Sequence, residues 1–151
     1  MIFEGKIDLK VPPVEAWDFL MDIDRFSSCL PAMEKIARID ERSFEGVMGA
    51  TVGPISGKFS FRSTIVESRP PKEFVVRTDG TDSVTKSTMR VDMTVKLTEP
   101  VADQTELGYH ANVEIKGRLA ILGDMILRAT AVVMLEEFIR RLRERLEGGG
   151  E

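Results

Sequence analysis

The sequence ends in one long stretch with a helical pattern, whereas most of the chain before it has a strand pattern. Residues 119–147 contain no proline, and at about 1.5 Å per residue a helix over this range would be roughly 43 Å long. The preceding chain reads as one strand, two short helices between residues 12 and 33, and about six further strands. Such a sheet must cover its apolar face, and only the terminal helix is long enough to do so. We therefore predict an α+β fold in which a seven-stranded antiparallel sheet curves around a long C-terminal helix.

The strand assignments rest on a period of two in hydrophobicity. Phe3, Ile7 and Leu9 alternate with charged residues in the first strand. In the stretch "KFSFRSTIVES", residues 59, 61, 63 and 65 fall on one side. Clusters of Gly, Pro, Asp and Ser predict turns at residues 40–43, 53–57, 70–72, 78–82 and 100–103.

The string "GPISGK" at residues 53–58 has some features of a phosphate-binding loop. Such a loop needs four residues between its glycines and a Ser or Thr after its lysine, and it opens a helix. Here three residues separate the glycines, Phe59 follows Lys58, and the chain continues as a strand. The pattern therefore predicts a hairpin turn and no nucleotide site.

Composition restricts the function classes. A chain of 151 residues suits a single domain, which we assign to residues 1–147 with a flexible tail at 148–151. The net charge of −4 gives no field that would attract nucleic acid. Cys29 is the only cysteine, which excludes an internal disulfide, and no signal-peptide pattern is visible, so we expect a cytoplasmic protein. The longest apolar run is far too short to span a bilayer, so any membrane contact would be peripheral.

Residues with catalytic or metal-binding chemistry are few. His110 is the single histidine, and strand alternation turns it outward, away from Tyr109. We interpret Cys29 as a small buried hydrophobic residue, and Asp22 and Asp24 as helix-capping residues. No catalytic set, metal site or resident cofactor is predicted from these residues.

The terminal helix carries two apolar stripes that point to a ligand cavity. We predict that the first stripe, residues 122, 125, 126, 129, 132 and 133, faces the sheet, and that residues 135, 138, 139, 142 and 146 form a second, rotated stripe. Methionines on the facing strands would accommodate varied ligand shapes, although ordinary core packing explains the same residues. The predicted lining is Met48, Phe59, Phe61, Met89, Met93, Tyr109, Leu122, Met125, Ile126, Ala129 and Val133, with Phe26 and Leu30 gating the entrance.

After these stripes the helix becomes charged. Opposite charges lie four residues apart at 136/140, 137/141 and 140/144, which is typical of a solvated helix face. The alternative is contact of this face with a partner or a membrane.

Three strings give the chain a family resemblance. They are "PPVEAWDFLMDIDRFSSCLPAMEKI" (residues 12–36), "VGPISGKF" (52–59) and "GRLAILGDMILRATAVVMLEEFIRRL" (117–142). Together they resemble the CoxG family of carbon monoxide dehydrogenase subunits, within the START/polyketide-cyclase-like (SRPBCC) superfamily. The resemblance implies a helix-grip fold with a hydrophobic cavity between sheet and helix. It also implies an accessory role for molybdenum hydroxylases of the carbon monoxide dehydrogenase type, in maturation, membrane recruitment or coupling to lipid-soluble electron carriers.

Three functional hypotheses follow. The first is a non-enzymatic module that binds a lipid-like or quinone-like molecule and assists such a hydroxylase, in the cytoplasm or at the inner face of the membrane. The second is a docking or maturation protein without a ligand, which would contact the enzyme through Arg140 and Arg143 or through the sheet edge. The third is a cyclase-like or hydrolase-like enzyme, which would need an inward polar group such as Tyr109 or Ser63.

Overall fold

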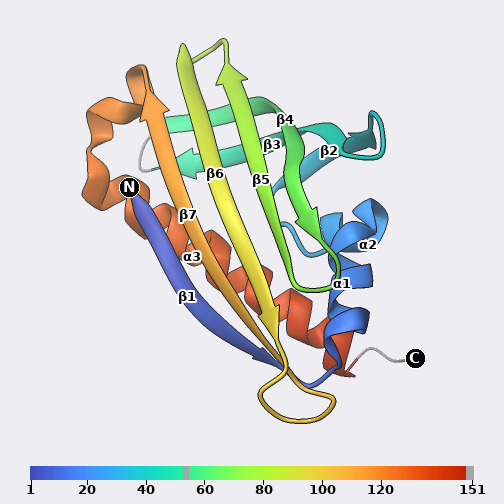
Figure 1. Ribbon diagram of the computed structural model, residues 1–151. Helices are drawn as coiled ribbons and strands as arrows, with labels where there is room; N and C mark the ends of the chain where they lie inside the picture. Colours follow the sequence, from blue (N-terminus) through green and yellow to red (C-terminus); the bar gives the residue numbers. More distant parts are fainter. Residues whose placement is uncertain (53–54, 149–151) are drawn as a thin grey trace.

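The computed structural model describes residues 1–52 and 55–148. Its elements follow the predicted order, with two short helices after the first strand and a long helix at the end (Figure 1). The strands are β1 (Ile2–Leu9), β2 (Met33–Arg38), β3 (Ser43–Val52), β4 (Ile55–Arg69), β5 (Glu73–Asp82), β6 (Ser87–Thr98) and β7 (Thr105–Lys116). The helices are α1 (Pro13–Met21), α2 (Ile23–Ser27), a 3-10 turn η1 (Arg118–Leu122), α3 (Asp124–Arg143) and a π-helical turn η2 (Glu144–Gly148).

All seven strands form one antiparallel sheet in the order β1-β7-β6-β5-β4-β3-β2. β1 and β2 are therefore the two edge strands. Figure 1 shows the strongly twisted sheet with α3 crossing one face of it. The predicted fold class, a seven-stranded antiparallel sheet around a long C-terminal helix, is confirmed.

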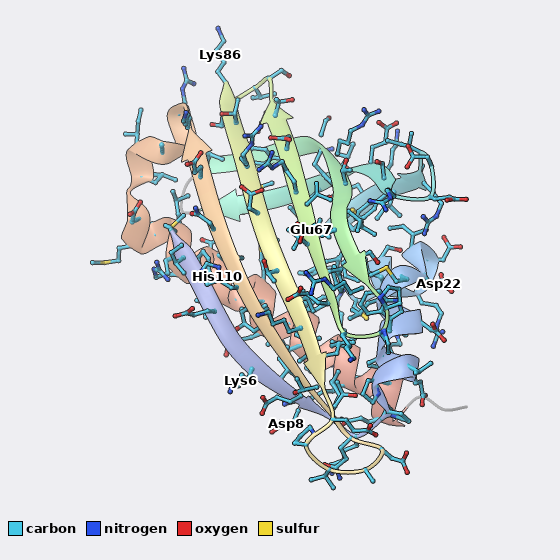
Figure 2. The ribbon with its side chains drawn as sticks, viewed as in Figure 1. Lys6, Asp8, Asp22, Glu67, Lys86 and His110 are labelled. Carbon is cyan, nitrogen blue, oxygen red and sulfur yellow. The ribbon has the colours of Figure 1, made fainter. Side chains whose placement is uncertain are left out.

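The outer face of the sheet, away from α3, carries the polar residues of the alternation (Figure 2). Opposite charges sit directly across from one another on β5 and β6: Arg77 Nε lies 2.7 Å from Asp92 Oδ1, and Arg90 Nε lies 2.8 Å from Asp79 Oδ1. His110 is on this face as predicted, 3.9 Å from a carboxylate oxygen of β1. The charged side chains of the sheet are thus turned away from its interior.

Two of the predicted turns differ from the structure. Residues 78–82 are the end of β5, and the turn follows at residues 83–86. Asp82 Oδ1 accepts hydrogen bonds from the backbone N–H groups of Val84 and Thr85, and these bonds stabilise the turn after Asp82. The other is the turn predicted at 53–57. Residues 53 and 54 lie outside the described part, but Gly57 already belongs to β4, where it pairs with Ala50.

The predicted terminal helix is interrupted near its start. Gly123 has φ of 85°, a left-handed conformation that a continuous right-handed helix cannot contain, so η1 ends there and α3 begins at Asp124. Residues 149–151 of the predicted tail lie outside the described residues, and Gly148 is the last residue of η2.

The core is divided into two clusters. The larger, called here the α1-side cluster, joins β1, α1, the middle strands and the C-terminal part of α3. Its buried members are Ile7, Leu9, Val11, Ala16, Trp17, Phe19, Cys29, Phe74, Val95, Leu97, Leu107, Leu142 and Leu146. The smaller, called the η1-side cluster, has the buried members Phe59, Leu119 and Leu127. α3 therefore packs onto the sheet at both of its ends.

Candidate functional site

α3 turns a different face to the sheet than the sequence predicted. Met125 and Val133 are 85% and 65% exposed, and Ile126 and Ala129 are also exposed, whereas Leu127 and Leu142 are buried. The prediction that the first stripe faces the sheet is wrong, because a straight helix keeps one face toward the sheet along its whole length. Steps of three and four residues back from Leu142 lead to 138, 135, 131 and 127, not to the first stripe.

Between the two clusters lies a band of inward-facing residues that belongs to neither. On the sheet it contains Phe61, Val91 and Val113, and on α3 it contains Ala131 and Met134. Phe61 is buried, and the other four are only half-buried although they lie on the inward faces of their elements. Interdigitated side chains would exclude water from such positions, so the helix and the sheet are packed less tightly here than at either end. We call these five residues the central band.

The predicted lining residues on the sheet surround this band. Met89 and Leu122 pack against the η1-side cluster, which includes Phe59, and Met48 is paired with Phe59 in the register of β3 and β4. Met93 and Tyr109 pack against the α1-side cluster. The sheet half of the predicted lining is therefore on the inner face, and of the helix half only Leu122 contacts the core.

Phe26 and Leu30, predicted to gate the cavity, lie where α2 meets α3. Ring centroids are 5.8 Å apart for Phe26 and Phe138, 6.4 Å for Phe26 and Phe44, and 6.2 Å for Phe44 and Phe61, all near edge-to-face. The backbone carbonyl of Leu30 accepts a hydrogen bond from Arg141 of α3 at 3.4 Å. The four rings of Phe138, Phe26, Phe44 and Phe61 thus form a continuous row of aromatic contacts. This row covers the α2 end of the helix–sheet interface and ends at Phe61 of the central band.

Of the two predicted capping residues of α2, Asp22 caps the helix, whereas Asp24 lies inside its first turn. Asp22 Oδ1 accepts hydrogen bonds from the backbone N–H groups of Asp24 and Arg25, at 3.1 and 3.3 Å, and caps the helix. Cys29, just after α2, is fully buried as predicted, and its burial raises the pKa of the thiol above the ordinary value. A buried thiol with a raised pKa is a poor nucleophile, so this cysteine acts as a core residue.

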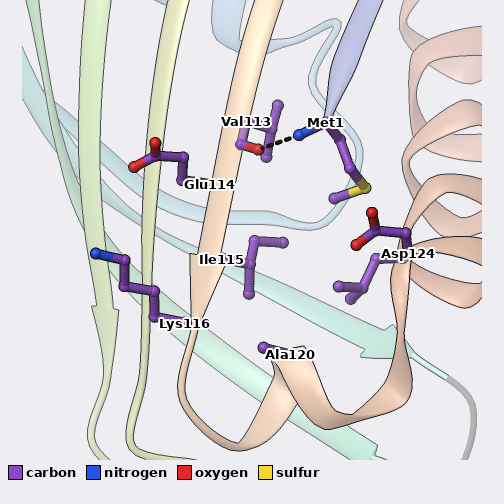
Figure 3. A pocket seen from close by; sticks show the side chains of 8 residues that line it. Met1, Val113, Glu114, Ile115, Lys116, Ala120 and Asp124 are labelled. Atoms are coloured by element: carbon purple, nitrogen blue, oxygen red, sulfur yellow. Dashed lines mark hydrogen bonds between the residues drawn. The ribbon is translucent and has the colours of Figure 1, made fainter.

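A pocket of about 300 Å³ opens at the start of α3 (Figure 3). It is lined by Met1, Val113, Glu114, Ile115, Lys116, Ala120, Asp124 and Leu127. The amino group of Met1 donates a hydrogen bond to the carbonyl oxygen of Val113 at 2.8 Å, which fixes the chain terminus at the pocket wall. Val113 also belongs to the central band, so the pocket and the band share this residue. Its volume is at the lower limit for small-molecule sites.

A second pocket, of about 520 Å³, lies at the β3–β4 hairpin. It is lined by Ala32, Gly49, Thr51, Ser56, Gly57, Lys58 and Val84, none of which comes from α3. Lys58 Nζ lies 3.1 Å from Glu34 Oε1 beside it. This pocket is separate from the predicted cavity.

Polar side chains are sparse on the inner face. Ser63 Oγ and Thr78 Oγ1 lie 2.7 Å apart and form a hydrogen bond with each other. Within residues 1–52 and 55–148, no group of three or more His, Cys, Asp or Glu residues is placed to hold a metal ion. The described helices include none that is both long and apolar enough to cross a membrane.

The charged part of α3 forms ion pairs on its outer face. Glu137 accepts hydrogen bonds from Arg140 and Arg141, and these bonds lower the pKa of its carboxyl group to about 2. Arg140 pairs with Glu137 and Glu144 rather than with Glu136, which differs from one of the three predicted pairs. The outer face of α3 thus changes from apolar to charged along its length.

The family model for CoxG, a carbon monoxide dehydrogenase subunit, matches residues 5–147. The chain belongs to the CoxG family. The match includes every strand of the sheet, at least in part, together with α3 and all lining residues of the pocket at its start except Met1, so the sequence resemblance is confirmed at the level of the family. A search of curated proteins finds no match.

Solved structures with the same fold extend over almost the whole CoxG chain. A conserved protein from Geobacillus kaustophilus is 20% identical, with a TM-score of 0.89 over 98% of this chain and 96% of the other. A START superfamily protein from Mycobacterium smegmatis is 13% identical, with a TM-score of 0.71 over 97% of each chain. The Zhui aromatase/cyclase from Streptomyces sp. R1128 is 12% identical, with a TM-score of 0.65 over 99% of this chain and 98% of the other. At these identities the likeness establishes the START-like fold alone.

Proposed function

We propose that this CoxG protein binds a hydrophobic, lipid-like or quinone-like molecule between α3 and the sheet, without catalysing a reaction. The observation that carries the proposal is the central band, whose residues lie on the inward faces of the sheet and of α3 while four of the five are still half-buried. Burying the band under an apolar ligand would contribute roughly 25 cal/mol per Å² before the cost of ordering the ligand. The pocket at the start of α3 shares Val113 with the band, and in this proposal the ligand enters there.

A non-catalytic role is supported by the distribution of reactive groups. His110 is on the outer face, Cys29 is buried with a raised pKa, and the hydroxyl groups of Ser63 and Thr78 are bonded to each other. Among the described residues the inner face therefore offers no acid–base pair of the kind that general acid–base catalysis requires. The structural likeness to an aromatase/cyclase is a likeness of fold only.

A matched pair of tryptophan variants tests the binding site. Ala131→Trp would place a large side chain in the central band, whereas Val133→Trp places it on the exposed face of the same helix, two residues away. We expect Ala131→Trp to weaken binding of cis-parinaric acid, a fluorescent fatty acid, by at least about tenfold, and Val133→Trp to leave it unchanged. Equal affinities in the wild type and in a folded Ala131→Trp protein would contradict binding in the band.

The partner in this proposal is a molybdenum hydroxylase of the carbon monoxide dehydrogenase type. Its support is the CoxG family itself, which takes its name from a subunit of carbon monoxide dehydrogenase. An accessory protein that carries an apolar molecule could deliver it to, or receive it from, such an enzyme.

A second candidate function, docking on that enzyme without a ligand, is favoured by the outer face of α3. Met125 and Val133 of α3 are 85% and 65% exposed, Ile121 of the preceding turn η1 is 82% exposed, and exposed apolar patches of this kind are typical of interaction surfaces. Met125→Glu together with Val133→Glu should then abolish capture of purified carbon monoxide dehydrogenase. Arg140→Glu together with Arg143→Glu, in the charged part of the same face, should weaken capture as well. Capture that survives both pairs of changes would remove this face from consideration.

A further inference from the structure

Tyr109 lies against the edge strand β1. It is paired directly with Gly5 in the register of β7 and β1. A Cβ atom built on Gly5 would lie 2.7 Å from Tyr109 Oη and 3.0 Å from Cζ, so the ring and its hydroxyl group lie directly over the glycine. The missing side chain at position 5 is what leaves room for the ring.

The position of the ring has a structural explanation, but that of the hydroxyl group has none. An aromatic ring over a cross-strand glycine covers backbone that would otherwise be exposed, and phenylalanine would cover it equally well. No described residue forms a hydrogen bond with Tyr109 Oη, and no unpartnered polar side-chain atom in the described part is sealed from solvent. The hydroxyl group is thus an accessible donor on an apolar face.

Tyr109 lies on the same inward face as the central band, two inward positions from it along β7, where it packs against the α1-side cluster. Along the inward side of β7, Tyr109 is followed by Ala111 and then by Val113 of the band, and Val95 lies directly across on β6. The other hydroxyl groups on the inward sides of the described strands are already hydrogen-bonded: those of Ser63 and Thr78 to each other, that of Thr105 to the carbonyl oxygen of Val11, and that of Ser87 to Thr85. A ligand that extends from the band along β7 toward the α1-side cluster would therefore meet a free donor at Tyr109.

We infer that Tyr109 Oη donates a hydrogen bond to an oxygen atom at the polar end of the ligand. Because the inference rests on the proposed binding function, it narrows the ligand class: an apolar body bearing a carbonyl or similar acceptor, in preference to a plain hydrocarbon. Tyr109 then determines specificity, while the central band supplies most of the affinity.

Two probes that differ in one acceptor test this inference. 2-Acetylnaphthalene and 2-ethylnaphthalene share the ring system and the length of the substituent, and only the first has a carbonyl oxygen. Removing a hydrogen bond of ordinary strength by Tyr109→Phe should weaken binding of the ketone about threefold to tenfold and leave the hydrocarbon unchanged. Titrations of both proteins with both probes, together with thermal unfolding to verify an intact fold, give the comparison.

A second variant repeats the test without altering the tyrosine. Gly5→Ala forces Tyr109 Oη away from its position, so we expect the same selective loss of ketone binding. Equal effects on both probes, or none on either, would overturn the inference while leaving the binding function intact. If neither probe binds the wild-type protein, both the inference and the proposed binding site are wrong.

Discussion

The end of the sheet that meets the C-terminal half of α3 is filled with apolar side chains, whereas the end that meets η1 is fastened largely by buried polar groups. The α1-side cluster includes Leu9 and Leu142, which are 1% and 0% exposed. At the η1 end, Asp82, Thr85 and Ser87 are 3%, 4% and 2% exposed, and they bond to one another or to nearby backbone.

This difference between the two ends explains how α3 can pack firmly on the sheet and still leave loosely packed positions between helix and sheet. Apolar packing at the α1 side stabilises the fold, and the cost of disturbing it is high. At the η1 side, the hydrogen bonds of Asp82, Thr85 and Ser87 fix strands and turns beside an apolar cluster of only three buried residues, Phe59, Leu119 and Leu127. The central band and the pocket at Val113 lie between these two kinds of attachment.

The largest predicted effect comes from truncating the same residue type at the two ends. Leu142→Ala should lower the free energy of unfolding by about 3–4 kcal/mol, because it opens a cavity in the α1-side cluster. Leu127→Ala should cost about 2 kcal/mol, because Leu127 already lines a pocket and loses fewer contacts. Urea denaturation of both variants measures the difference. Equal losses would mean that the two ends are packed alike.

A smaller effect is expected from the polar end. Ser87 Oγ accepts a hydrogen bond from the backbone N–H of Leu119 at 3.0 Å, and this bond ties η1 to β6. Ser87→Ala leaves that buried N–H without its partner, which should cost about 1–3 kcal/mol. Hydrogen exchange at the Leu119 amide should accelerate as well, while the amides of the α1-side cluster keep their protection. A uniform change across the protein would show that η1 is not attached through this bond.

The smallest effect is a pH dependence at Asp82. Burial alone would raise the pKa of this carboxyl group, but hydrogen bonds from the backbone N–H groups of Val84, Thr85 and Lys58 lower it below the ordinary value. A carboxylate with a lowered pKa contributes its full stability above its unfolded-state pKa and loses it as the pH falls through the folded-state value.

The Asp82→Asn variant should therefore be less stable than the wild type at pH 7. The difference in their free energies of unfolding should become smaller below about pH 4. Urea denaturation at pH 7 and pH 3 measures this difference in free energy. A difference that stays constant with pH would mean that the charge of Asp82 does not contribute to stability.

The sequence allowed the fold to be predicted because its period-two patterns are strong and local. Phe59, Phe61 and Ser63 are buried on one side of β4 as expected, and the inward set on β7 is also the expected one. The turn at residues 78–82 was misplaced because Gly80 and Asp82 are typical turn residues. In the structure, Gly80 is a buried strand position and the Asp82 side chain closes the turn that follows.

The candidate site was only half predictable, for a reason specific to α3. A helix with two apolar stripes has two possible inner faces, and hydrophobic spacing alone does not decide which one meets the sheet. Extending the stripe that contains Leu142 back toward Leu127 would have given the correct face. Gly123 also contributed to the wrong prediction, because the break in the helix before Asp124 allows α3 to run in a different direction from η1. The lining role of each residue stays a prediction.

Native mass spectrometry of the purified protein, followed by organic-solvent extraction, tests the central claim most directly. The account predicts a stoichiometric apolar species with at least one acceptor oxygen, bound to the wild type and to Val133→Trp but lost from Ala131→Trp. A ligand-free mass that stays unchanged after incubation with fatty acids and quinones would contradict it, and the central band would then be ordinary core.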